Sequence, residues 1–135
     1  MDEEPAGVRS AASAACPCGS GRPYSDCCGV VHAGAAALTA EQLMRSRYSA
    51  FVLRLAPYLL KTWDPSTRPR TIELDDTRWR RLQIVDTVGG GPHDADGVVE
   101  FRASYRTDEG VGVLHERSRF VRADGDWVYL DGRQL

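Results

Sequence analysis

The sequence predicts an α+β fold in which helices come first and an antiparallel sheet follows. Apolar residues between positions 40 and 63 recur with the 3.6-residue period of a helix, whereas after position 79 the period changes to two. Glycine-bearing turns interrupt the second half at short intervals, and such short connections suit hairpins. We therefore expect helices packed on a curved antiparallel sheet of about four strands.

The first 34 residues have little apolar content with which to build a core. Residues 1–14 contain a single branched apolar residue, Val8, so we expect a disordered tail. Residues 15–34 are rich in cysteine, glycine and other small residues and show no clear period. We therefore divide the chain into a tail (1–14), a cysteine module (15–34) and a sheet domain (35–135).

The sheet domain is expected to begin with a helix after residue 39. Thr39 is a good N-cap, and Gln42 stands three residues later in capping-box spacing. One apolar stripe follows at helical spacing: Met44, Tyr48, Phe51, Val52 and Leu55. Pro57 ends this helix or opens a second short one that reaches position 63.

The opposite face of that helix carries small, uncharged side chains where a solvent-exposed face normally carries Lys or Glu. These residues are Gln42, Ser46, Ser49 and Leu53. The pattern predicts a helix that is covered on both sides, with the cysteine module as the nearest candidate for the second cover.

Strands are expected near residues 79–88, 97–107, 111–123 and 126–130, each ending at a turn signal. The alternation is clearest from Val99 to Tyr105, where apolar and polar residues take turns. The sequence contains no internal repeat.

Charge and hydropathy exclude several classes of protein. Seventeen basic and nineteen acidic residues give the 135-residue chain a formal net charge of −2, so no global field attracts nucleic acid or anionic lipid. No apolar run approaches the roughly 20 residues that a membrane helix needs. The acidic N-terminus has no apolar signal-peptide segment, and we expect a cytoplasmic protein without membrane contact.

The four cysteines form two chelating pairs within thirteen residues. Cys16 and Cys18 are separated by one residue, and Cys27 is followed directly by Cys28. Four thiolates suit one tetrahedral Zn²⁺, and a site with four protein ligands is structural because it has no open position. Disulfides are the alternative, but they require an oxidising compartment. His32 is an alternative fourth ligand in place of Cys28.

The residues of this module resemble a known motif. The run Cys-Pro-Cys-Gly-Ser-Gly at 16–21, followed by the pair at 27–28, resembles the SEC-C zinc knuckle of the SecA translocase ATPase, whose last ligand is usually His. Several runs are similar to the bacterial YchJ family, at residues 38–51, 58–60, 62–63, 65–69 and 115–120. That resemblance implies a SEC-C knuckle joined to a nuclear-transport-factor-2-like cone of helices against a curved sheet, and it implies no known reaction.

A polar pocket inside the cone is a second candidate site. Glu116 shares a strand face with apolar residues, so we expect it to point inward and to need a partner such as Arg45 or Arg47. Arg47, Trp63 and Glu116 then line a polar pocket, or form a structural ion pair, which the sequence favours. His115 beside Glu116 suggests acid–base chemistry, but no nucleophile with an orienting group accompanies it, and the sequence favours a protein that is not an enzyme.

A basic stretch at residues 68–81 contains five arginines and Trp79, a composition that nucleic-acid-binding proteins share. Three acidic residues in the same stretch favour a solvated, salt-bridged surface instead. The sequence thus supports three hypotheses: an adaptor whose zinc knuckle binds a protein partner, a small-molecule binder or enzyme acting in the cone, and a ribosome- or RNA-associated factor.

Overall fold

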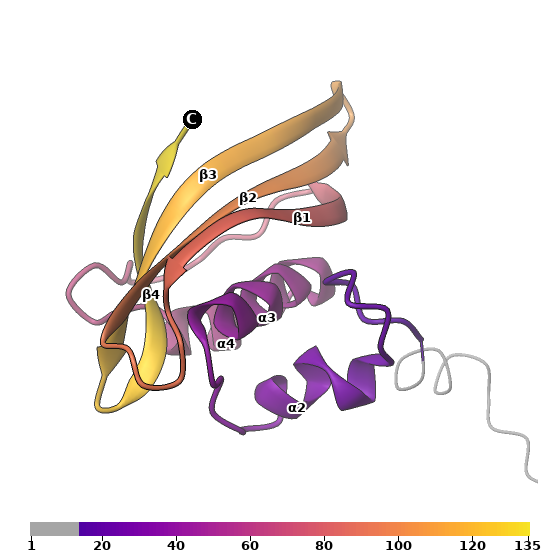
Figure 1. Ribbon diagram of the computed structural model, residues 1–135. Helices are drawn as coiled ribbons and strands as arrows, with labels where there is room; N and C mark the ends of the chain where they lie inside the picture. The colour runs from indigo at the N-terminus through magenta and orange to yellow at the C-terminus, as the bar shows by residue number, and fades with distance from the viewer. Residues whose placement is uncertain (1–13) are drawn as a thin grey trace, which may run out of the picture.

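The computed structural model describes residues 14–135, so the tail predicted at 1–14 lies almost wholly outside the described residues. The element order is helices first and strands second, as expected for an α+β fold. Helix α3 lies between two covers, with the sheet on one side and α2 on the other (Figure 1).

The cysteine module contains two short helical elements that its composition did not predict. A 3₁₀ turn, η1, spans Tyr24–Asp26, and helix α2 spans Cys28–His32. Helix α3 (Ala40–Leu53) begins at the expected cap, where the hydroxyl of Thr39 accepts a hydrogen bond from the Gln42 amide. The predicted cover on the second face of α3 is confirmed at its centre, because Ser46 and Ser49 are fully buried.

Helix α3 ends two residues before the predicted apolar stripe does. Arg54 adopts a left-handed conformation with φ 61° and caps α3, which removes Leu55 from the helix. Helix α4 (Ala56–Lys61) follows with Pro57 in its first turn, where a missing backbone donor costs nothing. Beyond α4, Trp63 forms a parallel bridge with Tyr129 and ties the helical layer to the last strand.

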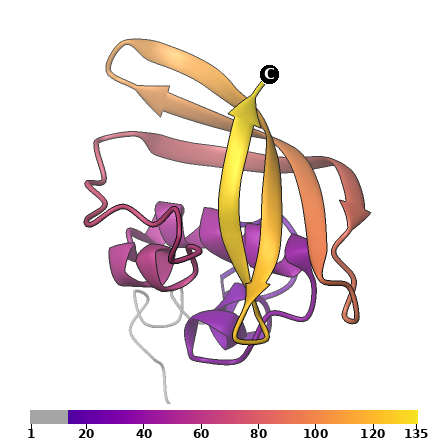
Figure 2. The ribbon, with the colours of Figure 1, turned by 90° about the vertical axis from the view of Figure 1, so that its left-hand side faces the viewer.

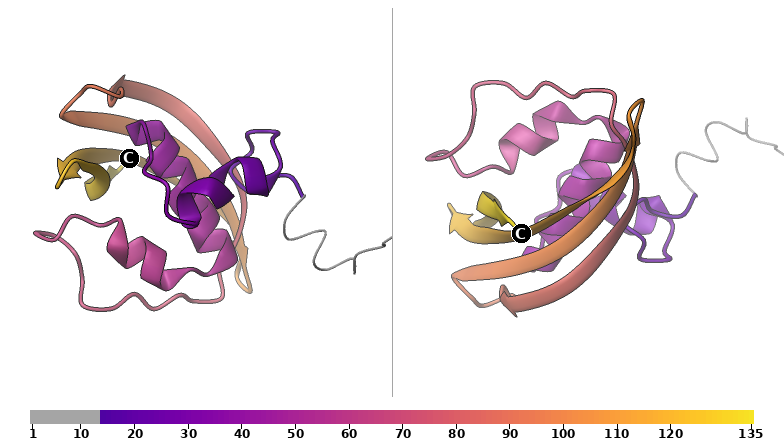
Figure 3. Two further views of the ribbon diagram at one scale, coloured as in Figure 1. Left: turned by 90° about the horizontal axis from the view of Figure 1, so that it is seen from below. Right: turned by 90° about the horizontal axis from the view of Figure 1, so that it is seen from above.

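Four strands form a meander in the order β1-β2-β3-β4, and every neighbouring pair is antiparallel (Figure 2). Their bounds are β1 Arg78–Gly89, β2 Asp96–Thr107, β3 Gly110–Ala123 and β4 Asp126–Gln134. Register shifts in β1 and near Arg119 in β3 mark bulges, which bend and twist a sheet. The sheet curves around α3 in the two views along the vertical axis (Figure 3).

Strand β4 runs four residues beyond its predicted end. Asp131 and Gly132 resemble a turn in the sequence, yet Gly132 pairs with Ser118 of β3 inside the strand. A side chain at position 132 would collide with the carboxylate of Glu116. A substitution at Gly132 would therefore displace the Glu116 carboxylate on the concave face, a contact that the local sequence does not reveal.

The core lies between α3 and the concave face of the sheet and continues into the cysteine module. Its largest fully buried side chains are Phe120, Leu43, Leu59 and Val99. Cys16, Cys18, Cys28 and Val31 belong to the same buried cluster as Leu43 and Tyr48. None of the helices among residues 14–135 is long and apolar enough to cross a membrane.

Candidate metal centre

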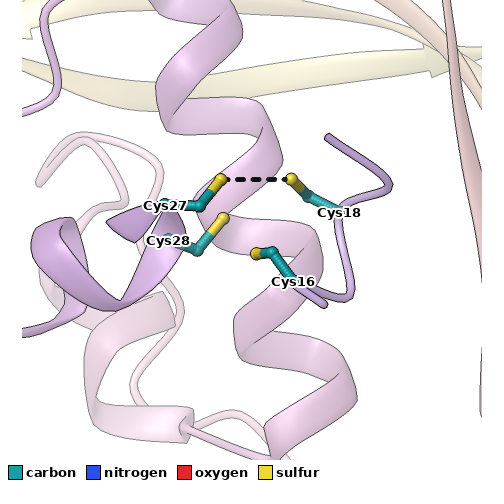
Figure 4. A group of neighbouring side chains, drawn as sticks. All are labelled: Cys16, Cys18, Cys27 and Cys28. Carbon is teal, nitrogen blue, oxygen red and sulfur yellow. Dashed lines mark hydrogen bonds between the residues drawn. The ribbon is translucent and has the colours of Figure 1, made fainter. Parts of the chain in front are cut away.

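The four predicted metal-ligating cysteines come together beside the middle of α3, next to Arg45 and Ser49. Cys16 and Cys18 approach from the first loop, whereas Cys27 and Cys28 stand at the start of α2, and their sulfurs point toward one another (Figure 4). All four Sγ atoms lie within 4.8 Å of one another. Tetrahedral Zn–S distances of about 2.3 Å place thiolates about 3.8 Å apart, so the cluster matches the size of a four-thiolate site.

The loop between the two pairs is shaped by hydrogen bonds and positive-φ glycines. The Cys16 amide donates to the Arg22 carbonyl at 2.8 Å, which closes the loop. Gly19 and Gly21 have φ of 83° and 86°, a region that other residues rarely adopt. The Ser20 hydroxyl lies 3.2 Å from Cys27 Sγ, so the returning loop also contacts a predicted ligand.

Three of the four cysteines are buried, and Cys27 is partly exposed. The neighbouring Cys28 thiol lowers the pKa of Cys18 to about 4, and the same interaction raises the pKa of Cys28; Cys18 Sγ also lies 3.7 Å from Cys27 Sγ. Burial raises the pKa of Cys27. One stabilised thiolate beside three further sulfurs attracts a divalent cation, which displaces the remaining protons on binding.

Helix α3 supplies second contacts to the cluster that the sequence did not single out for this purpose. Ser49 Oγ lies 3.6 Å from Cys16 Sγ, and Arg45 Nη1 donates a hydrogen bond of 2.9 Å to the carbonyl oxygen of Cys18. The only signal in the sequence was the uncharged face of α3. The small side chains on this face of α3 let the cysteine loop approach the helix closely.

His32, the alternative fourth ligand, makes other contacts with both of its ring nitrogens. Nδ1 lies 2.6 Å from the hydroxyl of Tyr24, and Nε2 lies 2.8 Å from the carbonyl oxygen of Ser46. Burial lowers the pKa of His32, so the ring is neutral at pH 7. The cluster of four sulfurs therefore contains Cys28 Sγ, whereas His32 is a clamp between η1, α2 and α3.

The structure brings together three of the four residues of the predicted polar pocket. Arg47 is 4% exposed, and its guanidinium carbon lies 5.2 Å from the ring centre of Trp63 and 4.8 Å from that of Tyr129. Glu116 accepts hydrogen bonds from Tyr129 and Ser118 at 3.2 and 2.8 Å. A chain of contacts therefore links Arg47 to Glu116 through Tyr129.

The ion pair expected for Glu116 does not form within residues 14–135. Arg47 donates instead to the carbonyl of Leu59 and the hydroxyl of Thr62, at 2.8 and 2.7 Å. Arg45 pairs with Glu41, one helical turn away. Side-chain hydroxyls hold the Glu116 carboxylate instead, because Arg47 is bound to α4 and its C-cap and Arg45 contacts Glu41 and the cysteine loop.

His115 is separated from the pocket because it lies on the opposite face of β3. Its Nε2 lies 2.7 Å from Glu100, which also accepts a hydrogen bond from Arg117. Both partners lower the pKa of the Glu100 carboxyl, with the His115 contact as the larger cause. The acid–base pair of His115 with Glu116 is thus excluded by the alternation of side chains along a strand.

Comparisons with known proteins agree with this architecture. Residues 39–132 match the family model for the YchJ middle NTF2-like domain, and residues 13–29 match the SEC-C motif. The UPF0225 protein SCO1677 of Streptomyces coelicolor is 57% identical over 122 residues, which cover 89% of this chain and 95% of that protein. The UPF0225 protein CE1570 of Corynebacterium efficiens is 52% identical over 119 residues, covering 87% and 91%.

Two solved structures share the fold. The solution structure of RPA3114, a SEC-C motif containing protein from Rhodopseudomonas palustris, has a TM-score of 0.77 at 33% identity and covers 89% of this chain and 98% of its own. The crystal structure of a SEC-C motif containing protein from Psychrobacter arcticus has a TM-score of 0.68 at 32% identity, covering 86% and 80%. This chain therefore belongs to the YchJ (UPF0225) family, with a SEC-C motif preceding an NTF2-like domain.

Proposed function

We propose that this protein is a small cytoplasmic zinc-binding adaptor, in which the SEC-C motif holds one structural Zn²⁺ and presents a docking surface to another protein. The convergence of four cysteine sulfurs within 4.8 Å carries the proposal. Zinc needs four ligands in a structural site, and the chain supplies all four, so no position remains for water or substrate.

Zinc fits the donor set better than other common divalent ions. Thiolates are soft ligands that select zinc or iron–sulfur clusters over magnesium and calcium. Four thiolates around Zn²⁺ leave a formal charge of −2, and Arg45 stands close to it through the Cys18 carbonyl. The cation at position 45 therefore moderates the charge of the loaded site.

A cleft of about 540 Å³ beside the sulfur cluster supports a docking role. It lies between the cysteine module and α3, and residues of both signs line it, among them Arg22, Asp26, Glu41 and Arg45. Val30 also lines the cleft and is 45% exposed. A surface of mixed charge with an accessible apolar side chain suits a protein partner better than it suits a uniformly charged ligand.

The concave interior of the sheet favours the adaptor over a small-molecule binder or enzyme. Tyr48 and Phe101 are at most 5% exposed there, and Trp79 packs edge-on against Tyr48 and Tyr105. These side chains occupy the space where a ligand pocket would lie. Arg47 and Trp63 are accordingly assigned to packing, since two aromatic rings, the Leu59 carbonyl and the Thr62 hydroxyl contact the guanidinium.

Elemental analysis tests the metal assignment. Protein purified without added zinc should carry about one equivalent, and less than about half an equivalent would contradict a tight structural site. Replacing both Cys16 and Cys18 by Ser should abolish the metal, because two of four ligands are lost.

Affinity capture from cell extract tests the docking role with three variants. The double variant Cys16→Ser, Cys18→Ser should lose its partner, and Val30→Glu should lose it while retaining zinc. Val111→Glu is the matched control, because Val111 is 72% exposed but lies on the sheet. A partner that survives both the double variant and Val30→Glu would refute the adaptor role.

A further inference from the structure

The convex face of the sheet is an extended surface that no helix among residues 14–135 covers (Figures 1 and 3). Val99, Phe101 and Ala103 of β2 are buried toward α3, so the residues between them point outward. The strand register then identifies the outward residues of the other strands. Seven arginines lie on this face: Arg78, Arg81, Arg102, Arg106, Arg117, Arg119 and Arg133.

Charge on this face differs in sign from that of the whole chain. The carboxylates on this face include Asp86, Asp96, Glu100 and Asp131, fewer than the seven arginines. The chain as a whole carries a formal charge of −2. Positive charge is therefore concentrated on one surface, which creates a local field that the overall composition conceals.

Most of these arginines have no ion-pair partner within residues 14–135. Arg117 pairs with Glu100 and Asp86, and Arg119 pairs with Asp131. The other five take part in no ion pair in that part of the chain. Their charges remain available to an anionic ligand.

Like charges also stand directly opposite one another on neighbouring strands. Arg78 is paired with Arg106 between β1 and β2, and Arg117 is paired with Arg133 between β3 and β4. Directly opposed like charges destabilise a sheet. Folding alone gains nothing from this arrangement, whereas a bound polyanion would relieve the repulsion.

A hollow of about 320 Å³ on the same face offers a place for a phosphate group. Arg117, Arg119 and Arg133 line it together with Asp131, and Val98 contributes an apolar wall. Guanidinium groups bind phosphate oxygens bidentately. Arg133 has no ion pair within residues 14–135, so it is the side chain best placed to make such a contact.

The shape of the face distinguishes between kinds of polyanion. Strand spacing of about 4.8 Å makes a four-stranded sheet wider than the B-DNA major groove of about 12 Å once side chains are included. Trp79 and Phe101 lie on the concave face, and Tyr105 pairs with Trp79 and packs against its ring, so these aromatic rings are not offered to bases on the convex face. A flat bilayer would touch only the crest of a convex surface.

We propose that the convex face of the sheet binds double-stranded RNA through its phosphate backbone without reading its sequence. The minor groove of A-form RNA is wide and shallow and exposes 2′-hydroxyls beside the phosphates. Gln83 and Ser104 stand among the outward arginines of β1 and β2 and can hydrogen-bond such hydroxyls. This surface is distinct from the zinc module, so the inference does not depend on the proposed adaptor role.

Fluorescence anisotropy with a labelled RNA duplex of about 20 base pairs tests the proposal on the full-length, zinc-loaded protein. The variant Arg81→Gln, Arg102→Gln, Arg133→Gln should weaken binding about tenfold or more. It should also lower the slope of log K against log salt by about two to three, because each lost phosphate contact removes about one counterion.

A matched control separates this face from total charge. The variant Lys61→Gln, Arg68→Gln, Arg70→Gln removes the same charge from exposed sites away from the convex face and should bind within about twofold of the parent. Zinc content should be unchanged in both variants. The convex-face variant should unfold at the same or a higher temperature, since it removes repulsion.

Four outcomes would overturn the proposal. They are an absence of salt-dependent binding to the RNA duplex, equal losses in the two variants, binding to a DNA duplex or single-stranded RNA as tight as to the RNA duplex, and equal binding to vesicles containing phosphatidylserine. Zinc content and partner capture are measured separately, so failure here leaves the adaptor proposal standing.

Discussion

The cysteine module and the sheet domain are held in place by different kinds of interaction. The module has only two short helical elements, with three and five residues, and its buried side chains are mainly cysteines and Val31. The sheet domain buries Phe120, Leu59 and Trp127 against long strands that pair throughout. A short, glycine-rich segment requires a cross-link, whereas a four-stranded sheet on a helix is stabilised by its own apolar area.

Loss of the metal should produce the largest difference between the two regions. Cys18→Ser removes one of four ligands, and zinc binding can contribute on the order of 10 kcal/mol to the folding of such a module. We expect hydrogen-exchange protection to disappear from η1 and α2 and to persist in β2 and β3. Ser20→Ala, which alters only a hydroxyl beside Cys27, should retain zinc, and equal loss of protection in β2 would show that the regions do not fold separately.

Replacement of Arg47 should have the opposite effect, because it should destabilise the sheet domain and leave the metal site intact. Arg47→Met leaves the carbonyl of Leu59 without its donor and removes a cation between two aromatic rings. We expect the free energy of unfolding to fall by about 3 kcal/mol in chemical denaturation, with zinc content unchanged. A loss of zinc in this variant would contradict the separation of the two regions.

Tyr24 orients the His32 ring, whose Nε2 joins the module to α3 through the Ser46 carbonyl, so loss of the Tyr24 hydroxyl should have an intermediate effect. Tyr24→Phe removes the hydroxyl that lies 2.6 Å from His32 Nδ1 and should cost about 1 kcal/mol. The measurable result is faster zinc release to a chelator. An unchanged release rate would mean that the clamp does not restrain the metal site.

The environment of His32 also predicts that the stability of the folded protein depends on pH. Burial lowers the pKa of His32 in the folded protein, so protonation favours the unfolded chain. The stability that neutral His32 contributes is complete above its ordinary pKa of about 6.5 and is lost as the pH falls through the lower folded value. His32→Asn should therefore show a shallower loss of stability between pH 7 and 5, and parallel curves would refute this role.

The cap of α3 should give the smallest effect. Thr39→Ala removes the hydroxyl that accepts the Gln42 amide proton and should cost about 1 kcal/mol. Thermal unfolding of the zinc-loaded protein measures this loss of stability. Thr39→Ser retains a capping hydroxyl and serves as the control, which should stay close to the parent.

Sequence alone could predict features that depend on local spacing. The Thr39 cap, the change of period after position 79 and the four strands depend on short-range patterns, and the structure confirms them. The clustering of Cys16 and Cys18 with Cys27 and Cys28 is likewise predictable, because all four lie within thirteen consecutive residues. These features are predictable because neighbours in the chain are also neighbours in space.

Tertiary structure decided which distant side chains meet. His32 contacts Tyr24 and Ser46 instead of a metal, Glu116 contacts Tyr129 instead of an arginine, and His115 faces away from the pocket. The arginines of the convex face come from four strands, and only the register places them on one surface. Spacing along the chain fixes which face of an element a residue occupies, but the packing of separate elements fixes its partners.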